Sequence, residues 1–141
     1  MTRVLATARH ALIAIGAGAS AYLTYVHFAD DRVACPTSGC ERVQESFYAT
    51  PHGLPLSLAG LLLFVALAAL AASRGAGART AEAGIAVGGA VVAVYLIGVQ
   101  VAALGATCPW CLAADASLIG LAALAVARLG AEARRAGTVD G

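Results

Sequence analysis

Residues 107–129 read TCPWCLAADASLIGLAALAVARL, a run in which two cysteines open a long apolar segment. An α-helix rises 1.5 Å per residue, so about 20 mainly apolar residues cross the hydrocarbon core of a bilayer. The segment from about Cys108 to Leu129 meets this requirement. Pro109 suits the first turn of a helix, because the N–H group that proline lacks would have no partner there. The sequence therefore predicts a membrane-spanning helix that begins at its two cysteines.

The composition of the whole chain points to the same class of protein. Its 141 residues are 60% hydrophobic and 12% charged, and the mean hydropathy is +0.82. An ordinary soluble domain is about 25% charged. The net charge of +1 leaves no broad basic face of the kind that binds nucleic acid. We therefore expect a single integral membrane domain over residues 1–141.

Three other apolar segments are also long enough to cross a bilayer. The fold class that we expect is an all-α membrane protein, a bundle of four transmembrane helices followed by a C-terminal tail over residues 130–141. The expected spans cover residues 8–28, 54–73, 83–104 and 108–129.

Single residues suggest how these helices begin and pack. Glu82 precedes the third expected span, where a negative charge is favourable at a helix N-terminus. Gly84 and Gly88 form a GxxxG pair in that span, and Gly16 and Ser20 form a similar small pair in the first. Such pairs let two helices approach closely, although they also arise by chance in a sequence this rich in alanine and glycine.

The arginines predict the orientation in the membrane, since cytoplasmic loops carry an excess of positive charge. Two arginines, Arg32 and Arg42, lie within the expected outer loop over residues 29–53, where four acidic residues accompany them. Seven arginines fall on the other side. We therefore expect a multi-pass cell-membrane protein with both termini in the cytoplasm and all four cysteines outside it. The seven arginines are Arg3, Arg9, Arg74, Arg79, Arg128, Arg134 and Arg135.

The outer loop is expected to contain a short amphipathic helix at the membrane surface. The segment CERVQESFY, residues 40–48, places Val43 and Phe47 four residues apart on one side of such a helix. Pro51 would end it, because the residue before a proline disfavours the helical region. This helix would lie across the mouth of the bundle.

The four cysteines form two close pairs, Cys35 with Cys40 and Cys108 with Cys111, which suggests thiol redox chemistry or a metal site. Cys108 and Cys111 are three residues apart and share a helix face. The partial positive charge of a helix N-terminus stabilises a thiolate, the species that reacts in disulfide exchange. We expect the sulfur of Cys108 to meet water and that of Cys111 to meet the bundle interior.

Three interpretations of the cysteines compete. A structural disulfide between residues three apart would constrain little of the unfolded chain. A zinc site of four cysteines is possible in principle, but an oxidising compartment favours disulfides. Redox activity explains the pattern best. The sequence lacks the GxGxxG motif of nicotinamide and flavin sites and the CxxCH motif of haem attachment. A lipid-soluble quinone is therefore the expected electron acceptor, and a cysteine-based metal-binding or transport protein is the alternative.

The same residues carry a family resemblance. The loop pair in CPTSGC, a serine six residues after its second cysteine, the segment HGLPLSLAG and a final CPWC together resemble bacterial homologues of vitamin K epoxide reductase. The resemblance covers most of residues 11–130. Many of these relatives carry a fused thioredoxin-like domain, which this sequence lacks.

The resemblance implies a disulfide-forming oxidoreductase with a redox-active centre. Cys108 and Cys111 would be the active-site pair, with Cys111 nearest the quinone, which would be menaquinone or ubiquinone. Cys35 and Cys40 would carry electrons from a separate extracytoplasmic thioredoxin-like (DsbA-type) protein. Ser46 matches the family's loop serine, which is implicated in this relay.

Three further residues are candidates for contact with the quinone. Asp115 follows Cys111 by one turn, at the position of a quinone-contacting tyrosine in vertebrate members of the family. An ionisable residue in a bilayer usually faces the bundle interior, either as a functional group or bonded to another helix. Tyr95 and Gln100 of the third span are expected to line the cavity, or else to pack and to form an interhelical hydrogen bond.

Overall fold

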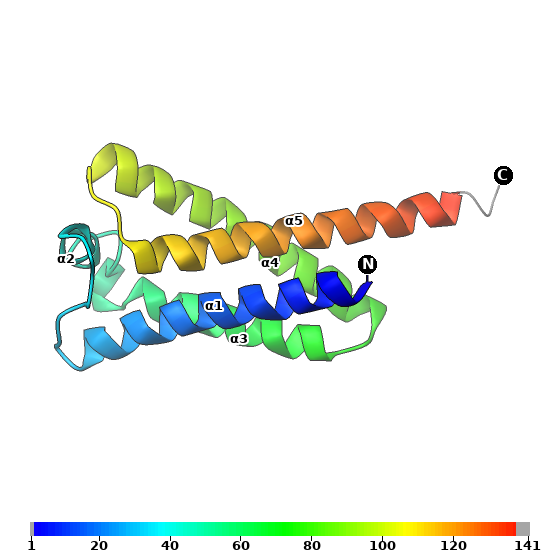
Figure 1. Cartoon of the computed structure of the whole chain (residues 1–141), viewed down its shortest axis with the longest axis horizontal. Helices are drawn as coiled ribbons and strands as arrows, with labels where there is room; N and C mark the ends of the chain where they lie inside the picture. The colour runs from blue at the N-terminus through cyan, green and yellow to red at the C-terminus, as the bar shows by residue number, and fades with distance from the viewer. Residues whose placement is uncertain (1, 138–141) are drawn as a thin grey trace.

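The computed structural model describes residues 2–137, and every regular element in this part of the chain is helical (Figure 1). Four long helices are joined by short connections, and a small helix lies in the first of them. The elements in chain order are α1 (Thr2–Phe28), α2 (Gly39–Gln44), the 3-10 helix η1 (Pro51–Gly53), α3 (Leu56–Ala72), α4 (Ala76–Gly98), the π-helical turn η2 (Val99–Ala103) and α5 (Pro109–Gly137).

The four long helices pack side by side as a bundle (Figure 1). Helix α5 packs on both α1 and α4, and α3 packs on α1 and α4. Helix α2 lies at one end of the bundle. The beginning of α1 and the end of α5 lie at the other end (Figure 1). This arrangement brings the first loop next to the beginning of α5, although they are far apart in the sequence.

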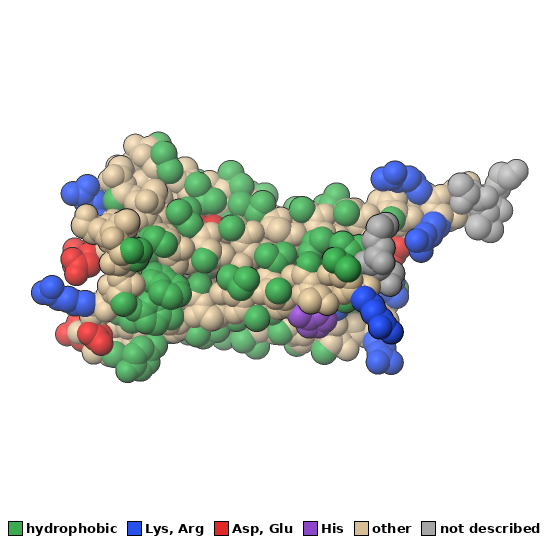
Figure 2. Space-filling model, in the orientation of Figure 1, with side chains coloured by type: hydrophobic (Ala, Val, Ile, Leu, Met, Phe, Trp, Pro, Cys, Tyr) green, Lys and Arg blue, Asp and Glu red, His purple; other side chains and the backbone are tan. Residues whose placement is uncertain are grey.

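Three helical segments are long and apolar enough to cross a membrane, namely residues 3–28, 76–103 and 109–137. Helix α3 is apolar but has 17 residues, about 25 Å at 1.5 Å per residue. It is shorter than the expected span because Pro55 and Ser73 are in extended conformations at its two ends. Figure 2 shows apolar side chains along the bundle and charged ones near its ends. The chain is an all-helical membrane protein.

The expected boundaries need two further corrections. The predicted tail begins too early, because α5 continues to Gly137, and the rest of the tail, residues 138–141, lies outside the described residues. Glu82 does not begin a helix, because α4 starts at Ala76. Its carboxylate is instead buried and paired with Arg9 at 3.1 Å. Arg9 also donates to the carbonyl oxygen of Ala71 at 3.2 Å, so these contacts tie α1, α3 and α4 together.

The small pair in α1 makes the close contact that was expected of it. A Cβ atom on Gly16 would collide with the ring of Phe64, a residue of α3 that is fully buried. Ser20 is buried one turn further along α1 and faces Gly60 of α3. The GxxxG pair of α4 does not form such a contact. No atom of the described chain would meet a Cβ atom on Gly84 or on Gly88 within 4 Å.

This difference predicts opposite results for one substitution at two glycines. Gly16→Val should destabilise the folded bundle by about 1–3 kcal/mol, because the added methyl groups must displace the enclosed ring of Phe64. Gly84→Val is the matched control, since it adds the same group to an open position in another helix. Thermal unfolding in detergent measures both. Equal destabilisation by the two changes would contradict the packing described here.

Candidate functional site

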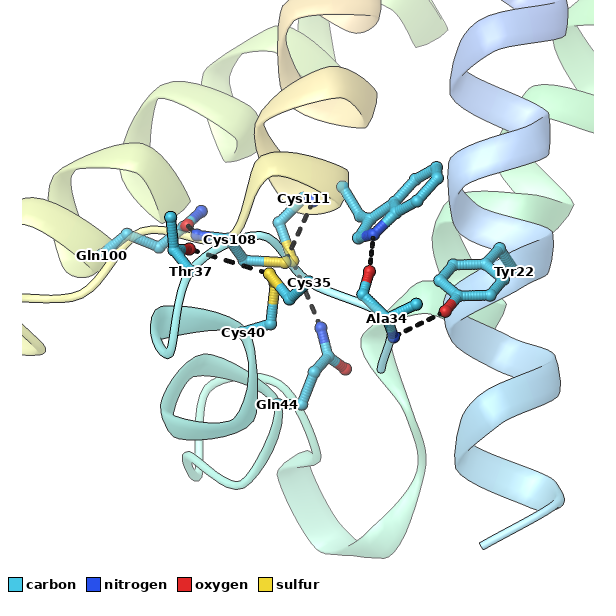
Figure 3. The surroundings of a disulfide bond; sticks show 10 residues. Tyr22, Ala34, Cys35, Thr37, Cys40, Gln44, Gln100, Cys108 and Cys111 are labelled. Atoms are coloured by element: carbon cyan, nitrogen blue, oxygen red, sulfur yellow. Dashed lines mark hydrogen bonds between the residues drawn. A yellow bond between two sulfur atoms is a disulfide. The ribbon is translucent and has the colours of Figure 1, made fainter. Parts of the chain in front are cut away.

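All four cysteines meet at the end of the bundle that carries α2 (Figure 3). Cys40 and Cys108 are fully buried in one cluster with Val43, and Cys35 and Cys111 pack against it. Cys35 and Cys40 form a disulfide, whereas Cys108 and Cys111 are free thiols. The structure thus brings the two predicted pairs into one site, although nearly 70 residues separate them in the sequence.

A close backbone contact holds the loop pair over the start of α5. Gly39, the residue before Cys40, lies against the backbone of Thr107, and a Cβ atom at this position would collide with the Thr107 carbonyl oxygen. Only glycine allows this approach without a shift of the chain. Thr107 immediately precedes Cys108, so the contact places Cys40 directly over the other cysteine pair.

Helix α2 is shorter than the predicted helix over residues 40–48. It ends at Gln44, where the hydroxyl of Ser46 donates to the carbonyl oxygen of Val43 at 2.6 Å. Val43 is buried as expected, but Phe47 lies beyond the helix and is 71% exposed. Pro51 does not end this helix either, because it begins the separate turn η1.

Cys108 stands immediately before α5, as predicted from the proline that follows it. Its backbone N–H donates to Oε1 of Gln100 at 2.9 Å, and its sulfur accepts the backbone N–H of Cys111 at 3.3 Å. The expectation that the Cys108 sulfur meets water is wrong, since the residue is 0% exposed. The loop pair and α2 cover it, and no pattern in the sequence predicts this contact.

The environment of Cys108 favours its thiolate. The hydrogen bond with the Cys111 side chain is the main reason why the pKa of the Cys108 thiol falls from its ordinary value to about 6. Backbone N–H groups of Cys111 and Trp110 lower this pKa further, while burial acts in the opposite direction. The thiolate is the nucleophile of disulfide exchange, so this environment favours the reactive form of Cys108.

Below the cysteines, the bundle encloses a cavity of about 290 Å³. All four long helices and α2 contribute to its mainly apolar wall. Cys111 lines the cavity, and its sulfur accepts a hydrogen bond from Nε2 of Gln44 at 3.2 Å. Asp115 lines it one turn deeper. This carboxylate is buried, and its Oδ2 atom has no hydrogen-bond partner among the described residues.

The other candidate residues divide between the cavity and the outer surface. Gln100 is buried and lines the cavity while it accepts the N–H of Cys108. Ser46 also lies in the cavity wall. Tyr95 does not line the cavity, and it is 59% exposed on the outside of α4. The expectation that Tyr95 lines the cavity is therefore wrong, because this face of α4 points away from the bundle.

Sequence reasoning missed Gln44 and the hydroxyls of Ser20 and Ser57, which also line the cavity. Gln44 follows Cys40 by four residues and so shares its helix face, a signal that was present in the sequence. The two serines are common in membrane helices, and no pattern distinguishes them. Among residues 2–137, no three His, Cys, Asp or Glu side chains gather as a set that could hold a metal ion.

Comparison with known proteins agrees with the architecture of this site. The model of the vitamin K epoxide reductase family matches residues 8–126, a stretch that includes all four cysteines, the cavity and most of the bundle. Among curated proteins, no sequence matches the chain significantly.

Proposed function

Because the chain belongs to the vitamin K epoxide reductase family, and so has the oxidoreductase character of that family, we propose that it oxidises thiols of an extracytoplasmic protein and passes the electrons to a membrane quinone. One observation carries this proposal. A disulfide in the first loop contacts a free cysteine pair, and one thiol of that pair lines an apolar cavity inside the bundle. In this proposal the loop disulfide receives the electrons, the free cysteine pair passes them on, and the cavity holds the acceptor.

The burial of the sulfurs supports an order of exchange. Cys35 is partly exposed and is the sulfur of the loop pair that a protein dithiol reaches, whereas Cys40 is buried against Cys108. A partner dithiol reduces the Cys35–Cys40 disulfide and leaves as a disulfide. The Cys40 thiolate then attacks the sulfur of Cys108 in an oxidised Cys108–Cys111 pair and releases the Cys111 thiolate.

The second half of the exchange regenerates the loop disulfide. The Cys35 thiolate attacks Cys40, the Cys40–Cys108 bond breaks, and Cys108 leaves as a thiolate. The low pKa of Cys108 makes it a good leaving group for this step. The structure, with a Cys35–Cys40 disulfide and two free thiols, corresponds to the state that follows this exchange.

The cavity fits a quinone as the oxidant of the Cys108–Cys111 dithiol. When bound, a quinone accepts two electrons and two protons as the dithiol becomes a disulfide. The apolar wall suits its ring and tail, and the carboxyl of Asp115 has an oxygen free to bond or protonate a ring oxygen. Cys111 lies in this wall, whereas Cys108 is not one of the cavity residues.

We further propose four membrane spans with the cysteine site on the extracytoplasmic side. Seven arginines belong to the end of the bundle that holds the start of α1, the α3–α4 connection and the end of α5, against two at the cysteine end. A membrane-impermeant maleimide applied to intact, reduced cells should therefore modify Cys35. Modification that requires lysis of the cells would contradict this orientation.

The relay is tested with the purified protein in lipid nanodiscs. A reduced thioredoxin-like dithiol protein and a short-chain quinone analogue should together produce quinol, which is followed by absorbance. Cys108→Ala and Cys111→Ala should each abolish this turnover, because exchange needs both sulfurs of the pair. When the partner is instead supplied as its disulfide, the free Cys35 thiol of Cys40→Ala should attack it and form a mixed disulfide, with release of one partner thiol, and Cys35→Ala should not. Tight metal binding without quinol formation would contradict the proposal and favour the metal-binding alternative.

Asp115 is expected to supply a proton during the reduction of the quinone. Asp115→Asn keeps the size and hydrogen-bonding capacity of the side chain but removes its proton, so quinol formation should fall by about 10²–10⁴-fold, the usual range for a general acid. The pH dependence of the rate should flatten as well. Ser117→Ala is the matched control, because Ser117 is buried on the same helix but is not a cavity residue and bonds Ala113. A normally folded Asn variant with unchanged rates would refute this role.

A further inference from the structure

Both backbone polar groups of Ala34, the residue before Cys35, form hydrogen bonds with aromatic side chains from two different helices. The N–H group of Ala34 donates to the hydroxyl oxygen of Tyr22 at 2.8 Å, and the Ala34 carbonyl oxygen accepts Nε1–H of Trp110 at 2.9 Å (Figure 3). The two rings touch each other, with centroids 4.7 Å apart and planes tilted by 45°. Tyr22 belongs to α1 and Trp110 to α5.

The two hydrogen bonds from Ala34 to Tyr22 and Trp110, here called the aromatic clamp, hold a segment that has no regular secondary structure. Residues 31–35 have no regular secondary structure. Within the described chain, the two bonds to Ala34 are the hydrogen bonds that link residues 32–38 to another element of the fold. The remaining ones are local, from Arg32 to Asp31 and between Cys35 and Thr37. Apart from the disulfide to Cys40, the position of Cys35 therefore depends on Tyr22 and Trp110.

Trp110 also touches the other cysteine pair, because it stands between Cys108 and Cys111 in the sequence. Its indole N–H donates to the carbonyl oxygen of Ala34, the residue before Cys35, and its side chain packs against the buried cluster that contains Cys40 and Cys108. One residue thus contacts both pairs at once.

The backbone groups of Ala34 do not need these two side chains as hydrogen-bond partners. Ala34 is exposed, so water would satisfy its N–H and C=O groups if the aromatic side chains were absent. The net gain in stability from exchanging such water contacts for protein contacts is small. What the two bonds determine is where the chain runs just before Cys35.

We propose that Tyr22 and Trp110 are positioning residues for the exchange between the two cysteine pairs, a role that rests on the relay proposed above. In this exchange one S–S bond breaks as another forms, and the proton of the attacking thiol passes to the departing one. The attacking sulfur must lie in line with the bond that breaks. A displacement of about 1 Å can slow such a reaction by roughly 10²-fold.

The exchange can be isolated from the quinone and from the partner in a Cys111→Ala background. There, Cys108 attacks Cys40 of the loop disulfide, a Cys40–Cys108 disulfide forms, and Cys35 becomes a free thiol. Excess maleimide traps this thiol, so the rate at which Cys35 is labelled reports the exchange. Mapping of the peptides by mass spectrometry identifies the labelled cysteine and the remaining disulfide.

Tyr22→Phe removes the hydroxyl that accepts the N–H of Ala34, and Trp110→Phe removes the indole N–H that donates to the Ala34 carbonyl oxygen, while each keeps an aromatic ring in place. Each should slow the labelling of Cys35 by about tenfold or more, because the loop disulfide is no longer held in line with Cys108. Tyr25→Phe is the matched control. It makes the same change on the same helix, at a residue that is 68% exposed. Its rate should equal that of the parent.

Fluorescence gives a second measurement that involves no exchange chemistry. Trp110 is the only tryptophan of the chain, so its emission reports the clamp directly. Tyr22→Phe should shift this emission to longer wavelength and make it easier to quench with acrylamide, whereas Tyr25→Phe should leave both unchanged. Circular dichroism confirms that each variant keeps its helices.

Each outcome decides one question. Labelling rates in Tyr22→Phe and Trp110→Phe equal to that of the parent, or an equal loss in Tyr25→Phe, would overturn the positioning role and leave the relay intact. Labelling of Cys108 with an intact Cys35–Cys40 disulfide in the Cys111→Ala parent would overturn the relay itself, and the positioning role with it. A shifted emission together with slow labelling of Cys35 supports the inference.

Discussion

The approach of Gly39 to the backbone of Thr107 is the contact on which the chemistry of this protein depends. The absence of a side chain at residue 39 lets α2 lie directly on the connection that leads into α5. The residues that follow each partner of this contact are Cys40 and Cys108, and both are fully buried as a result. Two cysteine pairs from distant parts of the chain thereby share one site in which Cys40 and Cys108 are shielded from water, and the exchange that we propose between them needs no movement of a domain.

The end of α4 also helps to position the cysteine site. The helix widens into a π-helical turn over Val99–Ala103, a feature that is frequent at functional sites. Gln100 lies in this turn and accepts the backbone N–H of Cys108 while it also lines the cavity. The same residue therefore positions the start of α5 and forms part of the space in which we propose that the quinone binds. A buried N–H without this acceptor would destabilise the start of the helix.

The two ends of the bundle use polar contacts for different purposes. At the end that holds the start of α1, Arg9 and Glu82 form a buried ion pair, and Arg9 also bonds the last turn of α3, so three helices are joined there. At the cysteine end, the polar groups bond sulfurs and the loop backbone, as Gln44 does with Cys111 and Trp110 with Ala34. One end holds the helices together, and the other positions reactive atoms.

The sequence by itself determined the class of the protein, the approximate course of its helices and the two cysteine pairs that meet in the candidate site. These properties follow from local patterns: long apolar runs, a proline after Cys108, and cysteines in two close pairs. The two pairs of small residues looked alike in the sequence, and only the pair in α1 makes a close contact. The sequence did not predict the short α3 or the early end of α2. The extended conformation of Pro55 sets the start of α3, and the hydrogen bond from Ser46 to Val43 lies at the end of α2.

Only the tertiary structure decided which way each side chain points and what covers it. Tyr95 and Gln100 lie in the same apolar run, yet the rotation of α4 in the bundle turns one outward and the other into the cavity. Glu82 was expected at a helix start and instead pairs with an arginine 73 residues away. Cys108 was expected in water and is buried, because a glycine and an aromatic clamp from other parts of the chain hold the first loop over it. Burial depends on contacts between distant segments, and a local pattern carries no information about them.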